Sequence, residues 1–272
     1  MIIQHNIAAI NSYRNLGINQ SGLNKNLEKL SSGYRINRAG DDAAGLAISE
    51  AMRSQINGLN QATKNANDAI GLIQTAEGAL TETHSMLQRL TTLATQSANG
   101  TYNTVARGNL QKEVDALISE IDRIANNTDF NGIKPIESGS DDKLMTFQIG
   151  PSAAETIEVE RGDMTASGIG VSSVNVETLS DGNAAIDTIS DAIDYVSEHR
   201  AKLGAAQNRL EHTVNNLKVT SENITAAESR IRDTDMADEI TAFTKNNILL
   251  QASQSMLAQS NSVPQSVLSL LG

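Results

Sequence analysis

Apolar residues recur at every seventh position in two long stretches of the chain. The first stretch consists of Met52, Leu59, Ala66, Ile73, Leu80, Leu87 and Ala94, and the second of Ile189, Val196, Leu203, Leu210, Leu217, Ile224 and Ile231. Heptads sustained over this many turns predict long helices joined along an apolar seam. At about 1.5 Å per residue, each run corresponds to a helix roughly 60 Å long. Their equal lengths, at opposite ends of the chain, predict two helices that lie side by side.

Between these runs the apolar pattern changes twice. Spacings of four and three predict a third helix through Leu110, Val114, Leu117, Ile121 and Ile124. Residues 144–150 and 156–160 have β-type composition around the turn sequence GPSAA and predict a hairpin. Residues 161–182 are rich in Gly, Ser, Thr and Val, which predicts loops with room for a short strand. The expected fold is therefore mainly α, with long antiparallel helices in a coiled-coil-like bundle and a small β-hairpin elaboration.

The two ends of the chain carry shorter and thinner apolar patterns. Near the N-terminus these are Ile3, Ile7 and Ile10, then Leu23, Leu27 and Leu30; near the C-terminus they are Leu249, Met256, Val263 and Leu270. Ile231 and Leu249 are not separated by a multiple of seven, so the C-terminal helix is expected to be a segment separate from the long helix before it. Asn, Gln and Ser dilute both terminal seams, and such helices are marginal when isolated. We therefore expect both termini to need a partner, either each other or neighbouring subunits.

Composition and charge narrow the possible functions. The 272 residues include no Cys and no Trp, and aromatic residues make up only 3%. The absence of Cys excludes disulfides and thiol catalysis, and the net charge of -11 argues against nucleic acid or an anionic membrane as the main partner. The N-terminus does not resemble a Sec-type signal peptide, and no apolar run approaches the roughly 18 residues of a membrane span. These facts alone predict a soluble cytoplasmic protein.

The stretch LSSGYRINRAGDDAAGLAIS, residues 30–49, is the first place to look for chemistry. It lacks the GxxxxGK[ST] pattern of a phosphate loop, and its adjacent aspartates would repel a phosphate. A connector is the simpler interpretation: Gly33 ends one helix in a left-handed conformation, and Asp41 or Asp42 caps the next. The sequence HExxH is absent, and His84, His199 and His212 are expected on solvated helix faces. We therefore expect no catalytic residue, cofactor or bound metal.

Five segments of the sequence closely resemble bacterial flagellins. They are NLEKLSSGYRINRAGDDAAGLAISEAMRSQINGL (26–59), GLIQTAEGALTETHSMLQRL (71–90), RAKLGAAQNRLEHTVNNL (200–217), NITAAESRIRDTDMADEI (223–240) and ILLQASQSMLAQSNSVPQSVLSLL (248–271). The resemblance covers roughly the first 135 and the last 85 residues. It implies a short flagellin without large variable outer domains.

The resemblance also implies a domain arrangement. The expected parts are an inner terminal helix with a spoke connector (1–42), outer-shell helices (43–135), a β-hairpin with loops (136–182), an outer-shell return helix (183–233) and an inner terminal helix (234–272). Both termini together would form the inner domain of a filament.

The implied function is structural. The chain would be a subunit that polymerises into the bacterial flagellar filament, an extracellular location reached unfolded through the flagellar type III export route. A hook–filament junction protein is the alternative within the same family. The rival from another class is an enzyme, since some flagellins carry a metallopeptidase insert, but the middle of this chain is short and has no HExxH. The implied partners are further copies of the chain, an export chaperone, the junction and cap proteins, and a Toll-like innate receptor of the host.

Two sets of residues are implied as contact sites. The family's receptor-binding segment matches at Arg89 and Leu93, and its downstream acidic position matches Glu113, although Thr91 and Thr92 stand where strong receptor ligands have Arg-Glu. The candidates for contacts between subunits are Arg35, Arg38, Asp41, Asp42, Leu249, Met256, Val263 and Leu270. The four charged members were expected to form charge pairs with neighbouring subunits.

Overall fold

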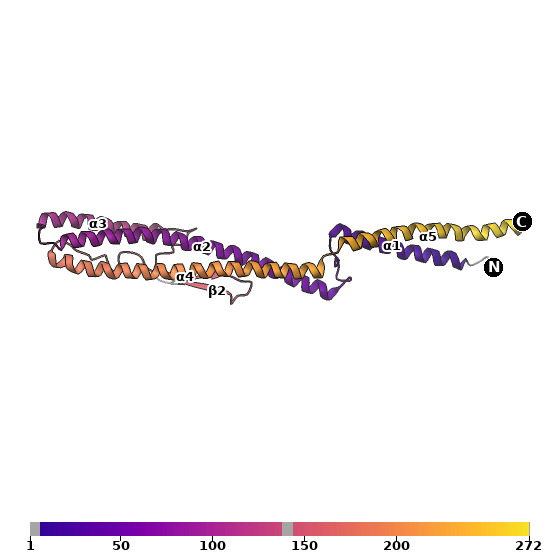
Figure 1. Cartoon of the computed structure of the whole chain (residues 1–272), viewed down its shortest axis with the longest axis horizontal. Helices are drawn as coiled ribbons and strands as arrows, with labels where there is room; N and C mark the ends of the chain where they lie inside the picture. The colour runs from indigo at the N-terminus through magenta and orange to yellow at the C-terminus, as the bar shows by residue number, and fades with distance from the viewer. Residues whose placement is uncertain (1–5, 138–143, 272) are drawn as a thin grey trace. The chain divides into compact units, whose positions relative to one another are not determined.

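The computed structural model describes residues 6–137 and 144–271, except for the side chains of 264–271 (Figure 1). The helices are α1 (Ile7–Ser32), α2 (Ala43–Ser97), α3 (Thr104–Asn127), α4 (Leu179–Arg232) and α5 (Met236–Leu271), and the strands are β1 (Leu144–Gln148) and β2 (Thr156–Glu160). This confirms the mainly α fold class with its small hairpin. It also confirms the separate terminal helices, since α4 ends before α5 begins.

The chain divides into two compact units. One comprises Asn57–Ser221 and is called the bundle unit here; the other comprises Met1–Ile56 with Glu222–Gly272 and is called the terminal unit. Helices α2 and α4 contribute residues to both units. Each unit is described by itself below.

In the bundle unit, α3 and α4 both run antiparallel to α2. Arg107, early in α3, donates from Nε to the carbonyl oxygen of Ser97 at the end of α2 (3.0 Å). Glu77, in the middle of α2, pairs with Arg200 of α4 (3.6 Å). Gly182, at the start of α4, lies so close to the end of α2 that an added Cβ would be 3.0 Å from the Ala98 nitrogen. The absence of a side chain at position 182 lets the two helices approach there.

The heptad residues form the core of the bundle unit. Those that are buried are Leu59, Ala66, Ile73, Leu80, Leu87, Ala94, Ile189, Val196, Leu203, Leu210 and Leu217. All but the outermost, Leu59 and Leu217, belong to one hydrophobic cluster, which also includes residues from α3, the hairpin and the loop before α4. A helix surrounded on several sides needs a wide apolar stripe, which explains why α2 buries more positions than one heptad seam supplies.

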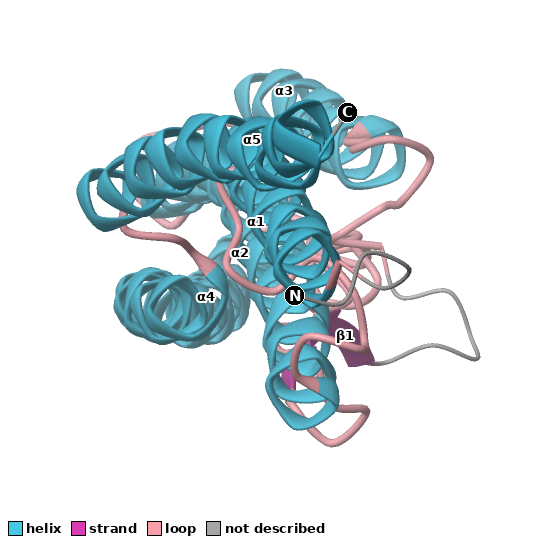
Figure 2. Ribbon diagram, turned by 90° about the vertical axis from the view of Figure 1, so that its right-hand side faces the viewer, coloured by secondary structure: helices cyan, strands magenta, loops and turns pink. Residues whose placement is uncertain are grey.

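The hairpin covers one side of this core with a single apolar face. Strands β1 and β2 pair antiparallel, with Met145 opposite Val159 and Phe147 opposite Ile157. Met145, Val159 and Ile157 are buried, as alternation along a half-buried strand requires. Figure 2 shows how small this strand region is beside the helices. Residues 161–178 form no strand, so the short strand that the sequence allowed there is not present.

His199 departs from the sequence-based expectation. His212 is exposed, but the side chain of His199 on α4 is only 6% exposed, so the prediction of a solvated face was wrong for this residue. The backbone at Gly162 passes over the imidazole, where an added Cβ would lie 2.9 Å from Nδ1. Burial lowers the pKa of His199, and Lys202 lowers it further, while Glu160 and Glu198 act in the opposite direction. Burial therefore favours the neutral form of the ring.

Candidate assembly surface

Helices α1 and α5 form an antiparallel pair in the terminal unit (Figure 1). Asn19 of α1 donates from Nδ2 to Ser253 Oγ of α5 (2.8 Å). Further along α1, Lys29 pairs with Glu239 (3.6 Å). Residue numbers thus rise along α1 as they fall along α5, and polar contacts join the two helices at several levels.

Apolar side chains of this pair remain uncovered. The exposed large hydrophobic residues of α1 and α5 are Ile7, Ile10, Tyr13, Ile18, Leu27, Met236, Ile240, Ile248, Leu249, Met256 and Val263. Ile36 is the only fully buried hydrophobic side chain among the described residues of the terminal unit. So many exposed large apolar side chains on one helix pair make it a candidate interaction surface. The structure thus places the candidates Leu249, Met256 and Val263 on an open surface, whereas the side chain of Leu270 lies outside the described residues.

The connector between α1 and α2 has the caps that its sequence predicts. Gly33 ends α1 with φ 75°, and its N–H donates to the Lys29 carbonyl oxygen (2.8 Å). Asp42 Oδ1 accepts the Gly45 N–H at the start of α2 (2.9 Å). Asp41 accepts the N–H groups of Arg38 and Asn37, and these two hydrogen bonds lower the pKa of its carboxyl group. These interactions shape the loop locally and need no ligand.

The same connector is joined to the junction of α4 and α5. Arg35 donates its N–H to the Arg232 carbonyl oxygen (2.7 Å), and Thr234 donates its N–H to the Gly33 carbonyl oxygen (3.0 Å). The Arg232 guanidinium lies over the Tyr34 ring, 4.7 Å from the centroid, and pairs with Glu50 of α2 (2.6 Å). The two chain segments that enter the terminal unit are therefore held together by backbone and side-chain contacts.

The charged candidates for contacts between subunits all have partners within the chain. Arg38 pairs with Glu28 (2.8 Å), and Arg35 donates from its guanidinium to the Ile231 carbonyl oxygen. Asp41 and Asp42 accept the backbone N–H groups described above. Bonds between subunits at these positions therefore stay a prediction, and they would have to use the remaining donor and acceptor capacity of these groups.

The receptor-contact candidates lie in the bundle unit. Arg89 of α2 and Glu113 of α3 form an exposed ion pair, with Nη2 2.7 Å from Oε1. Leu93 lies one turn further along α2 but is only 1% exposed and belongs to the core cluster. Leu93 therefore offers no surface to another protein, and the exposed pair carries that prediction.

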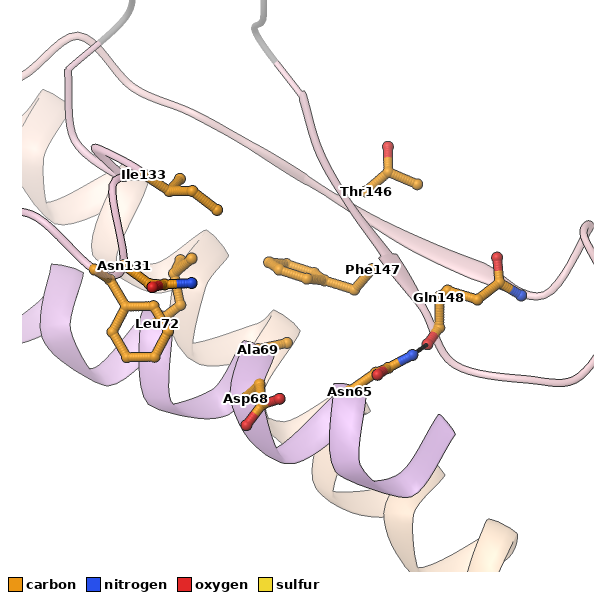
Figure 3. A pocket seen from close by; sticks show the side chains of 10 residues that line it. Asn65, Asp68, Ala69, Leu72, Asn131, Ile133, Thr146, Phe147 and Gln148 are labelled. Carbon is orange, nitrogen blue, oxygen red and sulfur yellow. Dashed lines mark hydrogen bonds between the residues drawn. The ribbon is translucent and has the colours of Figure 1, made fainter. Parts of the chain in front are cut away.

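One pocket of the bundle unit is large enough to need an account. It has a volume of about 510 Å³ and lies between α2, residues 130–133 and β1 (Figure 3). Apolar and polar residues line it together, with Leu72, Phe130 and Phe147 among the apolar ones. Asn65 donates from Nδ2 to the Gln148 carbonyl oxygen (3.2 Å) at one end. Among the described residues that line it, Asp68 is the one ionisable group, so these residues form no acid–base pair.

Within the described ranges no group of three or more His, Cys, Asp and Glu residues could hold a metal ion. No helix of the described chain is long and apolar enough to cross a membrane.

Comparison with known proteins identifies the family. The bacterial flagellin N-terminal helical region matches residues 3–138, and the bacterial flagellin C-terminal helical region matches residues 186–271. The chain belongs to the bacterial flagellin family. Flagellins of Bacillus subtilis (strain 168) and Halalkalibacterium halodurans are 51% and 52% identical to it, in each case over 100% of both chains. The crystal structure of Bacillus cereus flagellin covers 61% of this chain and 94% of its own, with a TM-score of 0.52 and 30% identity.

The flagellin matches and the structure divide the chain in related ways. The two matched regions contain α1, α2, α3 and α5 and nearly all of α4, whereas the hairpin lies between them. Both matched regions contribute to the terminal unit. The exposed apolar helix pair of this flagellin is thus built from the parts of the sequence that identify the family.

The sequence patterns did not predict the polar contacts of the terminal helices. Asn6 and Asn19 both reach across to α5, to Ser260 and Ser253 respectively. The sequence contains a signal for the Asn6 contact. Asn just before an apolar run is a helix-cap residue, and Pro264 lacks the backbone N–H that α5 would need at that position. The sequence contains no such signal for the Asn19 contact, because an Asn on a polar helix face does not indicate which residue it will contact.

Proposed function

We propose that this flagellin is a structural subunit of the extracellular flagellar filament and that it polymerises through its terminal unit. The observation that carries the proposal is the set of exposed large apolar side chains on α1 and α5. In one antiparallel helix pair, each helix buries only the side that faces its partner. Neighbouring subunits in a filament would cover the remaining sides.

The energetics restrict this assembly to a polymer. Ordering a residue costs about 1–2 kcal/mol in backbone entropy, and fully burying an Ile, Leu or Met side chain contributes about 1.5–3 kcal/mol. In a single chain the terminal unit buries almost none of its large apolar side chains. Contacts with neighbours supply the burial that an isolated pair lacks, so the terminal helices should become fully stable only in the filament.

The wider proposal includes export and partners. A subunit of an extracellular filament must leave the cell, and we propose the flagellar type III route with the chain unfolded. An export chaperone would hold the apolar terminal helices before export, and junction and cap proteins would contact the same helices at the two filament ends. For the Toll-like receptor we propose Arg89 and Glu113 as contacts, because both are exposed on adjacent helices.

Seeded polymerisation tests the central claim. Purified full-length chain and a variant lacking residues 249–272 would each be added to filament fragments and followed by light scattering and electron microscopy. We expect long filaments of uniform diameter from the full chain and none from the truncated one. The truncated chain should keep the unfolding transition of the bundle unit, which none of the deleted residues joins. Normal filaments from the truncated chain would refute the proposal.

The same experiment separates the filament subunit from the junction protein. A filament subunit adds to its own copies without limit, whereas a junction protein stops after a short layer. The 51% and 52% identity to two flagellins over the full length of both chains favours the first outcome.

A further inference from the structure

Asn6 makes two different hydrogen bonds at the start of α1. Its Oδ1 accepts the N–H of Ala9, which caps the helix (3.0 Å). Its Nδ2 donates to the carbonyl oxygen of Ser260 in α5 (2.8 Å), a residue 254 positions away in the sequence. One amide side chain therefore serves the backbones of both terminal helices.

The Ser260 carbonyl needs an outside donor for a reason visible in the sequence. Residue i+4 normally donates its N–H to carbonyl i in an α-helix, and the residue four positions after Ser260 is Pro264. Proline has no N–H, so Pro264 cannot make this bond inside α5. An unpaired carbonyl in a partly buried position is unfavourable, and the Asn6 amide provides a donor at this position.

We infer that Asn6 is a positioning residue for filament assembly: it fixes the register of α1 against α5 at the carbonyl that Pro264 leaves without its helical donor. This inference rests on the proposed function. It assigns to one side chain the alignment of the two helices that form the assembly surface.

The apolar contacts between α1 and α5 fix the register of the pair only weakly, so a polar residue is needed to define it. Asn26, rather than a large apolar residue, is the buried residue of α1. A slip of one helix past the other would change few apolar contacts, but it would break the Asn6–Ser260 bond and the Asn19–Ser253 bond together. Polar residues in a helix seam specify alignment in this way. A neighbouring subunit can fit the surface only when the side chains of α1 and α5 keep fixed relative positions.

A double-mutant cycle isolates the bond to Ser260 from the helix cap. Asn6→Ser keeps a capping hydroxyl but removes the amide donor. Pro264→Ala restores the backbone N–H that Ser260 lacks. The critical concentration for seeded polymerisation would be measured for the full-length chain, both single variants and the double variant, with Asn11→Ser as a control on an exposed Asn of the same helix.

We expect Asn6→Ser to raise the critical concentration about fivefold, the effect of losing one hydrogen bond per subunit. In the Pro264→Ala background the same substitution should change it less than about twofold, because the carbonyl then has its own helical donor. Asn11→Ser should leave it unchanged. Equal effects of Asn6→Ser in both backgrounds would mean that Asn6 acts only as a cap, and no effect in either would mean that it does not position the helices.

A second measurement separates this inference from the proposed function. If the full-length chain does not polymerise on seeds, the proposed function fails, and amide exchange of residues 7–10 in the soluble chain then decides the positioning role. Asn6→Ser should speed this exchange with Pro264 present and leave it nearly unchanged with Pro264→Ala. An equal change in exchange rate on Asn6→Ser in the two backgrounds would overturn the inference.

Discussion

The bundle unit and the terminal unit share the same two heptad helices, but they differ in how far the apolar residues of these helices are buried. The heptad positions of α2 are buried from Leu59 onward, whereas Met52 and Ile56, on the same helix but in the terminal unit, are only half-buried. On α4 the change comes after Leu217, and Ile224 is half-buried. The apolar period continues while the burial decreases. A heptad thus indicates which side of a helix is apolar. Whether that side is buried depends on how many other elements pack around the helix.

The two units also differ in what holds them together. The bundle unit has several helices and a hairpin around one apolar cluster. The terminal unit has a helix pair joined by Asn19, Lys29 and Asn6, and a connector joined by Arg35 and Arg232. Directional polar contacts align a structure without burying much surface. This difference suits a protein in which one part is stable alone and the other is completed by its neighbours.

The largest expected effect comes from removing apolar volume in the core of the bundle unit, and the same kind of change in the terminal unit should have little effect. Leu80→Ala should lower the free energy of unfolding of the soluble chain by about 2–5 kcal/mol, because Leu80 is fully buried and its loss leaves a cavity. Ile10→Ala should change it by less than about 0.5 kcal/mol, because Ile10 is 61% exposed. Urea unfolding followed by circular dichroism measures both. Similar losses for the two variants would contradict the contrast between the units.

A smaller effect is expected at the connector. Asp42→Ala removes the cap of α2 and should destabilise the terminal unit by about 1 kcal/mol, measured by amide exchange at the start of α2. Asp42→Asn is the matched control, since Asn caps as well as Asp but carries no charge. If Asp42 pairs with a neighbouring subunit, Asp42→Asn should weaken polymerisation without changing exchange. Unchanged polymerisation would remove Asp42 from the candidates for charge pairs between subunits.

Local patterns in the sequence predicted the helices, the hairpin and the caps, because each depends on residues that are near in sequence. The seams through Leu87 and Leu203, and the end of α1 at Gly33, are examples. Features that depend on distant segments were missed or misjudged. His199 is buried because the loop at Gly162 crosses it, and a helix pattern contains no information about that loop.

The candidate sites follow the same rule. An apolar residue beside a predicted seam can be either a contact or a core residue, and Leu93 is a core residue because α2 has neighbours on several sides. Asn6 was missed because its role requires the register of two helices from opposite ends of the chain. Sequence pattern thus predicted the terminal helices and their apolar residues but not the polar contacts that join them.

Acidification should affect the bundle unit through His199. Because burial lowers the pKa of His199 in the folded chain, the unfolded chain takes up a proton first as the pH falls below about 6.5. Stability contributed by the neutral ring is therefore present above that pH and lost below it. His199→Gln should show a smaller decrease in melting temperature between about pH 7.5 and about pH 5.5 than the unaltered chain.

His212→Gln is the matched control for this prediction, because His212 lies on the same helix and is exposed. It should retain the full decrease in melting temperature. The same decrease in the His199 and His212 variants would show that other groups, such as the nearby Glu160 and Glu198 carboxylates, cause the acid sensitivity.

A small effect on stability is also expected at the exposed ion pair of the bundle unit. Arg89→Ala should change the free energy of unfolding by less than about 1 kcal/mol, because both Arg89 and Glu113 are largely solvated. If Arg89 contacts a Toll-like receptor, the same variant should lower the affinity of the soluble chain for it. Arg123→Ala is the control, since Arg123 forms a similar exposed pair with Glu120 on α3. Loss of affinity in both variants would point to the overall charge rather than to a contact at Arg89, and unchanged affinity in both would leave Arg89 as a solvated surface residue.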